Sequence, residues 1–350
     1  MISDGNNKSI LAIYSLAGLL LAYSIFPEIG ITHDSRFYLE AGENLMSRGF
    51  QQTTFKYWPP LYPITIFLLS NKLWVISFFN IACWLISTYV ILKEVRRILA
   101  EDSLQNHFMV AGVVFSTPIF MVHNFVWSEP PFLACVFAFI LSLRSDHQRI
   151  WIAQILLAVA IVGFRHIGVT VITGSYLAVL IHRGFSAKDL SWVLVSASFF
   201  LLWQWHVSDL IGHTERVYYF RSLDLLHNYQ LISIGLARWF LPFDLAAFSL
   251  SIPVIWVALI TITIRVYKSI FFTSWGIISL LTFFLILVSP NLLFDDVERY
   301  LSISHPLIVI CIFSIMNKVR SIPFYLSNFL LLLFTFYSVL RTVKNAILWH

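Results

Sequence analysis

A polar segment between residues 33 and 63 holds the side chains of this sequence that are best suited to chemistry. Asp34 stands between His33 and Ser35, about eight residues after an apolar run. A carboxylate beside a membrane surface could act as a general base toward an incoming hydroxyl or amine. A simpler interpretation makes Asp34 the N-cap of a helix over Ser35–Ser47. Taken alone, Asp34 fits the cap better than the base.

Two arginines elsewhere in the sequence could bind a phosphate group. Arg299 precedes Tyr300 at the start of an apolar run, and Arg165 precedes His166 between two apolar runs. A guanidinium can give a phosphate two parallel hydrogen bonds. Each arginine also has an alternative role that involves only its sequence neighbours. Arg165 and His166 could form a structural polar pair in a tight turn. Arg299 could likewise pair with its neighbours Asp295, Asp296 or Glu298.

Metal binding and aromatic stacking are further hypotheses for the same region. His33 and Asp34, with Glu129 or His166, could supply metal ligands, but no His-x-x-x-His or Asp-x-Asp spacing supports this. We therefore assign no metal and no cofactor, and a divalent metal ion stays an alternative. Trp58, with Tyr57 and Tyr62, could line a groove for a sugar or a polyprenyl chain. Such residues more often form an aromatic belt at the membrane surface.

The amino-acid composition indicates that these residues belong to a membrane protein. Of the 350 residues, 59% are hydrophobic and only 12% are charged, and the mean hydropathy is +0.80. A soluble domain of this size needs more polar surface. One crossing takes about 20 apolar residues. The sequence therefore predicts one all-α polytopic domain over residues 1–350, with about eleven transmembrane helices (ten to twelve).

The predicted crossings follow the apolar runs between charge clusters. They are Ile10–Phe26, Leu73–Leu92, Phe108–Val122, Pro131–Leu143, Ile150–Phe164, Ile167–Ile181, Leu190–His206, Leu245–Ile264, Ile270–Ser289, Leu301–Met316 and Ile322–Leu340. The stretch from Ile150 to Ile181 would measure about 48 Å as one helix, so we expect two helices that turn near Arg165–His166. Pro59–Leu69 is too short to cross and is predicted to be an interfacial helix in the first outer loop.

The basic residues predict the orientation. With a cytoplasmic N-terminus, the inner segments hold the larger share of Lys and Arg and fewer acids than the outer ones, as the positive-inside rule requires. This basic inner face, next to anionic lipid, accounts for the net charge of +5 without a nucleic-acid partner. The main outer loops are then residues 27–72, 208–244 and 290–300, and every candidate above faces the outside. Arg341 and Lys344 would also lie outside, against the rule.

The order of these elements resembles the GT-C superfamily of membrane glycosyltransferases. The likeness is greatest to the family of dolichyl-phosphate-mannose protein mannosyltransferases and bacterial lipid A aminoarabinose transferases, and it covers roughly residues 10–320. It is carried by Asp34 with Tyr38 and Ala41, by Trp58-Pro59-Pro60-Leu61-Tyr62-Pro63, by Ser128-Glu129-Pro130, and by Glu298-Arg299-Tyr300-Leu301 through Pro306. The sequence departs from the family in having a single acid at Asp34, and in having Trp58 where some members place Lys.

The resemblance implies a GT-C-like fold and a specific reaction. A sugar would pass, with inversion, from a polyprenyl-phosphate-linked donor to a lipid, glycan or protein acceptor on the outer side of a membrane, which we expect to be a bacterial inner membrane. Asp34 would be the general base. The donor phosphate would be bound by Arg299, Tyr300, Arg165, Arg221 and Lys56, and the substrates would contact His33, Tyr38, Trp58, Glu129 and His166.

Two other classes of function compete with this one. A transporter or flippase of a lipid-linked or small polar substrate would also place polar residues at the ends of its spans. It should show inverted repeats and helices broken near the bilayer midplane. We find no such pairing of interrupted spans in two halves of the sequence, and the candidate residues concentrate on one side. An assembly partner without chemistry would tolerate replacement of Asp34 and Arg299.

Overall fold

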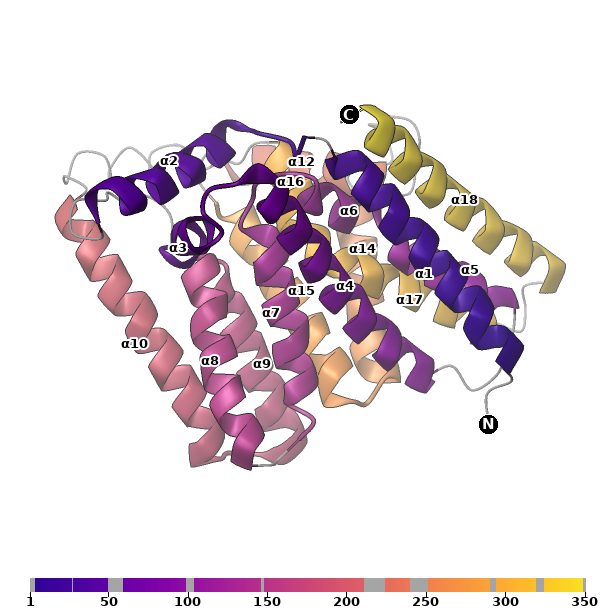
Figure 1. Cartoon of the computed structure of the whole chain (residues 1–350). Coiled ribbons are helices and arrows are strands. Elements are labelled where there is room, and N and C mark those ends of the chain that lie inside the picture. Colours follow the sequence, from indigo (N-terminus) through magenta and orange to yellow (C-terminus); the bar gives the residue numbers. More distant parts are fainter. Residues whose placement is uncertain are drawn as a thin grey trace.

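The computed structural model describes residues 4–26, 28–49, 59–98, 104–145, 148–210, 224–239, 251–289, 294–318 and 324–348. Within these ranges the regular elements are all helices (Figure 1). They are α1 (Asp4–Ile25), α2 (His33–Arg48), α3 (Leu61–Leu68), α4 (Leu73–Ile98), α5 (Leu104–Val114), α6 (Thr117–His123), α7 (Glu129–Ser142), α8 (Gln148–Phe164), α9 (Gly168–Arg183), α10 (Ala187–Leu210), α12 (Leu225–Arg238), α14 (Ile252–Val266), α15 (Ile270–Leu287), α16 (Phe294–Leu301), the 3₁₀ turn η2 (Ser302–Ser304), α17 (His305–Lys318) and α18 (Phe324–Leu348).

The hydropathy of these helices confirms an all-α, multi-pass membrane protein. In the described part of the chain, six helical stretches are long and apolar enough to cross a membrane, and α7, α8 and α14 provide shorter apolar helices. The six are Lys8–Ile25, Leu73–Arg97, Asn106–His123, Ile270–Leu287, Val297–Ile315 and Asn328–Leu348. A helix lies in each predicted crossing, but the count of eleven crossings is not confirmed by length and hydropathy.

Two local predictions can be compared directly with the structure. The run from Ile150 to Ile181 does break into two helices, because α8 ends at Phe164 and α9 begins at Gly168. Gly168 permits this tight turn, since a Cβ atom there would lie 2.6 Å from the carbonyl oxygen of Ile161. The predicted span Phe108–Val122, in contrast, is not one continuous helix. It is divided into α5 and α6 next to Pro118, whose missing N–H suits the first turn of a helix.

The long helices pack side by side, with α9 against α15, α4 against α7, and α8 against α10 (Figure 1). Helix α2 and the two short helices α3 and α16 lie at one end of this bundle, which we call the Asp34 end (Figure 1). Helix α3 has eight residues, about 12 Å of length, so it cannot cross a membrane. The core between the helices is rich in aromatic side chains. Trp275, for example, meets the ring of Phe137 edge-on at 5.1 Å and donates a hydrogen bond to the Ile303 carbonyl at 2.7 Å.

Candidate functional site

The first turn of α2 leaves the Asp34 carboxylate available for tertiary contacts. Thr32, not Asp34, is the N-cap: its hydroxyl accepts a hydrogen bond from the Ser35 amide at 3.3 Å, and the Ser35 hydroxyl accepts one from the Thr32 amide at 2.9 Å. This capping box satisfies the helix terminus without Asp34. The cap interpretation of Asp34 is therefore wrong. The positive end of the α2 dipole still favours a carboxylate at this position.

Backbone pairing joins the loop before α2 to the loop before α7. The Gly30 amide donates to the Asn124 carbonyl at 2.9 Å, and the Val126 amide donates to the Gly30 carbonyl at 3.1 Å. Gly30 is required for this approach, because a Cβ atom there would lie 2.4 Å from the Phe125 ring. Asn80, on α4, fixes the second loop by donating to the His123 and Phe125 carbonyls. This pairing sets the distance between Asp34 and Glu129.

Arg299, on the short helix α16, connects the two acids. Its Nη1 lies 2.8 Å from Asp34 Oδ2, and its Nε lies 2.8 Å from Glu129 Oε1. Arg165, in the turn between α8 and α9, makes a second ion pair with Glu129 Oε1. Four elements far apart in the sequence thus bring two carboxylates and two guanidiniums together. We call these residues, Asp34, Glu129, Arg165 and Arg299, the charge cluster.

The charge cluster is largely removed from solvent. The side chains of Glu129, Arg165 and Arg299 are 3%, 10% and 9% exposed, whereas that of Asp34 is 23% exposed. Asp34 is therefore the member that an entering substrate could reach first. The formal charges of the four groups cancel, so their mutual attraction offsets part of the free-energy cost of removing them from water. Glu129 Oε2 is buried and has no hydrogen-bond partner among the residues that the structure describes.

Aromatic and hydroxyl groups surround the charge cluster. The guanidinium carbon of Arg299 lies 4.0 Å from the centre of the Trp127 ring, and that of Arg165 lies 4.9 Å from the Tyr300 ring. Both contacts have the geometry of cation–π interactions. Trp127 is itself fixed by a 2.8 Å hydrogen bond from its indole N–H to the Thr32 hydroxyl. The arginines are therefore held by stacking as well as by charge.

Tyr38, a buried residue of α2, lies next to the charge cluster. Its hydroxyl lies 3.3 Å from that of Ser128, and its ring meets the Tyr62 ring edge-on at 4.7 Å. Burial raises the pKa of Tyr38 well above its usual value, so the hydroxyl keeps its proton at neutral pH. Arg165 Nη1 also reaches Ser128, at 3.5 Å. Ser128 thus links the tyrosine to the arginine.

The remaining predicted site residues are not part of the charge cluster or lie outside the described residues. His33 is exposed and meets the Phe37 ring edge-on at 4.8 Å. His166 lies 3.1 Å from Gln204 and beside Phe200. Lys56, Trp58 and Arg221 fall outside the described residues. Among the side chains that are described, no group of three or more His, Cys, Asp or Glu could hold a metal ion.

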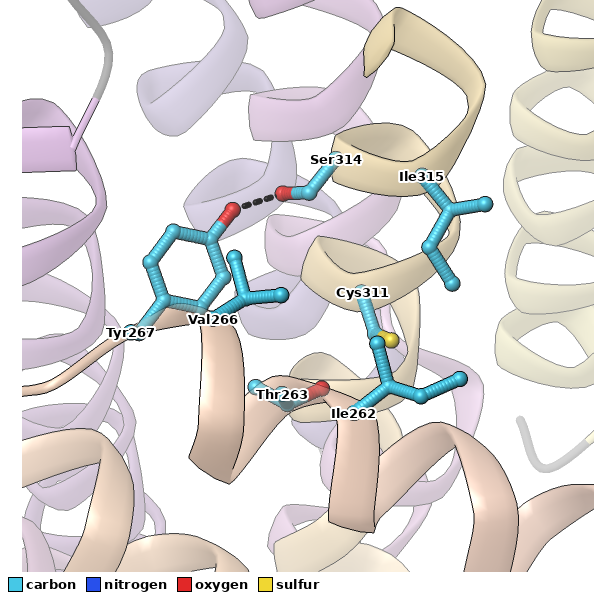
Figure 2. Close-up of a pocket in the computed structure, with 7 residues that line it drawn as sticks. All are labelled: Ile262, Thr263, Val266, Tyr267, Cys311, Ser314 and Ile315. Atoms are coloured by element: carbon cyan, nitrogen blue, oxygen red, sulfur yellow. Dashed lines mark hydrogen bonds between the residues drawn. The ribbon is translucent and has the colours of Figure 1, made fainter. Parts of the chain in front are cut away.

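A separate pocket of about 150 Å³ lies between α14 and α17 (Figure 2). Its polar groups already have partners within the protein. Thr263 and Cys311 both donate to the Leu259 carbonyl, and Ser314 contacts the Tyr267 hydroxyl. No charged residue lines it; the lining residues are Ile262, Thr263, Val266, Tyr267, Cys311, Ser314 and Ile315. The pocket therefore offers no cation for phosphate binding and no carboxylate or imidazole among its lining residues.

Sequence reasoning missed several residues that shape the site. Trp127 gave no signal as a cation partner, because nothing in the sequence places its ring under Arg299. Ser128 stood in a recognised Ser-Glu-Pro segment without an assigned role. Glu298 was one of three alternative local partners of Arg299, but its Oε1 lies 2.7 Å from Nη2 of Arg341. Arg341, which lay against the positive-inside rule, therefore has a carboxylate partner at the Asp34 end.

Comparison with known proteins supports the fold. No protein-family model matches the sequence, and no curated protein does either. Among solved structures, the chain is similar to the crystal structure of ArnT from Cupriavidus metallidurans bound to undecaprenyl phosphate, with a TM-score of 0.58 and 14% sequence identity. The similarity covers 89% of this chain and 60% of the ArnT chain, so this chain spans less than two thirds of that protein. The expected GT-C-like fold is confirmed.

Proposed function

We propose that the protein transfers a sugar from a polyprenyl-phosphate-linked donor to a hydroxyl or amine acceptor, with inversion, at the Asp34 end on the outer side of the membrane. One observation carries the proposal most directly. Arg299 contacts both Asp34 and Glu129 at 2.8 Å, so a candidate base lies next to a buried cation in a GT-C-like fold. The ArnT structure was solved with undecaprenyl phosphate, a ligand of the proposed chemical class.

In this proposal the two arginines bind the donor phosphate. Arg299 and Arg165 share one oxygen of Glu129, so their guanidiniums lie close together in spite of their like charge. A phosphate entering from the exposed Asp34 side would meet Arg299 first and compete with Asp34 for its N–H groups. Guanidinium groups suit this exchange, since carboxylate and phosphate oxygens accept the same paired hydrogen bonds. Asp34 then loses its cation partner as the donor binds.

The reaction follows from that exchange. The acceptor oxygen or nitrogen attacks the anomeric carbon, the bond from that carbon to the phosphate oxygen breaks, and the acceptor proton passes to Asp34. The donor phosphodiester leaves as a phosphate monoester, whose second pKa is near 6. Asp34 loses a negative charge as the phosphate gains one, so the net charge of the site does not change. A leaving phosphate needs no second acid, unlike the leaving oxygen in glycoside hydrolysis.

The test is an assay of the full chain in liposomes with undecaprenyl phosphate carrying a radiolabelled hexose, pentose or aminopentose. A membrane extract supplies lipid, glycan and protein acceptors, and the release of undecaprenyl phosphate is measured. We expect release by the wild type, and a loss of about 100- to 10,000-fold in Asp34→Asn, the range for a general base. Glu40→Gln is the matched control, because Glu40 is an exposed carboxylate on the same helix.

Two outcomes contradict the proposal. If folded Asp34→Asn releases undecaprenyl phosphate at the wild-type rate, Asp34 is not the base. If the wild type carries the intact donor across the bilayer and never cleaves it, the transporter or flippase hypothesis replaces the transferase.

A further inference from the structure

The last described helix, α18, reaches the Asp34 end and binds two other helices there through Arg341. Nη2 of Arg341 lies 2.7 Å from Glu298 Oε1 on α16, and Nη1 lies 2.5 Å from the carbonyl oxygen of Arg238 at the end of α12. The Tyr337 hydroxyl, one turn earlier on α18, donates to the same carbonyl at 3.1 Å. One guanidinium therefore joins α12, α16 and α18.

Helix α16 depends on such contacts for its position. It has eight residues and continues without a gap through η2 into α17, so contacts along its own length decide the direction in which Glu298 and Arg299 point. It also packs against α6, α12 and α15, and its contact with α12 is close, since a Cβ atom on Gly235 would lie 2.6 Å from Val297. Val297 and Arg341 thus fix two sides of α16, one by packing and one by charge.

The residue that follows Glu298 is Arg299. Successive residues of a helix point about 100° apart, so Glu298 meets α18 while Arg299 meets Asp34 and Glu129. A rotation or shift of α16 that breaks the pair with Arg341 would also move the Arg299 guanidinium. Such movement matters because a misplacement of about 1 Å can cost a reaction about 100-fold.

We infer that Arg341 is a positioning residue that sets the orientation of Arg299 toward the donor phosphate by holding Glu298 and the end of α12. This role rests on the proposed function, since it requires that Arg299 bind that phosphate. The pair is also shielded, because the Arg341 and Glu298 side chains are 16% and 11% exposed. Solvent screening, which makes most surface ion pairs nearly neutral in free energy, is therefore reduced here.

The experiment measures binding of undecaprenyl phosphate to the full chain in liposomes, together with the KM values of donor and acceptor. We expect Arg341→Gln and Glu298→Gln each to raise the Kd of undecaprenyl phosphate about tenfold, which corresponds to about 1.4 kcal/mol. The acceptor KM should stay at the wild-type value. The double variant should be no worse than Arg341→Gln alone, because both changes break the same ion pair. Lys344→Gln, which removes an exposed charge one turn further along α18, should match the wild type.

A second comparison separates positioning from a general structural role. In an Arg299→Gln background, Arg341→Gln should have no further effect on the Kd, since the group it positions is gone. A further tenfold loss in that background would overturn the inference, as would a wild-type Kd in folded Arg341→Gln. If Arg341→Gln does not fold, Glu298→Gln takes its place in both measurements, alone and in the Arg299→Gln background. A wild type that neither binds undecaprenyl phosphate nor releases it from a donor would instead refute the proposed function.

Discussion

Arg299 Nη1 lies 2.8 Å from Asp34 Oδ2, and the two residues are 265 positions apart in the sequence. The proposed base and the residue proposed to bind the donor phosphate are therefore partners of each other. A bound phosphate would compete with Asp34 for Arg299, and this competition has measurable consequences. Measuring this competition tests whether Asp34 acts in the reaction or only stabilises the fold.

The first prediction concerns the affinity of Asp34→Asn for undecaprenyl phosphate. We expect this variant to bind the lipid phosphate more tightly than the wild type, by about three- to tenfold, even though it no longer supports transfer. The amide removes a negative charge near the phosphate, and it replaces the ion pair with Arg299 by a weaker hydrogen bond from the guanidinium to a neutral oxygen. Equilibrium binding in liposomes, at one salt concentration, measures the change. Weaker binding by Asp34→Asn would mean that Asp34 does not compete for Arg299.

The second prediction concerns stability. Glu129 is the buried partner of both arginines, so Glu129→Gln leaves two guanidiniums with one carboxylate. Breaking a buried ion pair by removing one partner costs about 3–5 kcal/mol, and we expect a loss of unfolding free energy in that range. Denaturant unfolding in detergent measures it. Glu40→Gln, on an exposed carboxylate, should cost less than about 0.5 kcal/mol. An equally small loss in Glu129→Gln would contradict the buried charge cluster.

The third prediction concerns the ring beneath Arg299. Trp127→Leu removes the cation–π contact, worth about 0.5–2 kcal/mol, so the donor KM should rise about two- to thirtyfold. Trp127→Phe keeps a ring but loses the hydrogen bond to Thr32, and we expect an intermediate value. Steady-state kinetics at saturating acceptor provide the comparison. If Phe and Leu raise the donor KM equally, the hydrogen bond to Thr32 and not the ring holds Arg299.

The fourth prediction concerns the turn that carries Arg165. In Gly168→Ala the new methyl group would lie 2.6 Å from the Ile161 carbonyl oxygen, and a backbone atom cannot move aside as a flexible side chain can. We expect a loss of about 1–3 kcal/mol in stability, the usual cost of overpacking, and weaker donor binding. Gly18→Ala is the control, since its methyl group would meet only the Trp84 ring at an ordinary 3.5 Å. The two variants are compared by thermal unfolding and by donor binding.

The sequence alone determined the class of the protein, because hydropathy is a property of each segment. Apolar runs separated by charge clusters were enough to predict helices in a membrane, and the length of the run from Ile150 to Ile181 was enough to predict the turn near Arg165. The sequence also identified the candidate site residues by their side-chain type; they are Asp34, Glu129, Arg165 and Arg299. A carboxylate can act as a base and a guanidinium can bind a phosphate at any position in the sequence.

Only the tertiary structure decided which of these residues are partners. Glu298 is next to Arg299 in the sequence, yet the turn of α16 directs it to Arg341, while Arg299 reaches Asp34 and Glu129 on other helices. The identity of the α2 cap depended on the geometry of Thr32 and Ser35, and the contact of Trp127 with Arg299 depended on the pairing of two loops. Ion pairs, caps and stacking act over a few ångströms, and helix packing alone brings residues from opposite ends of the sequence that close.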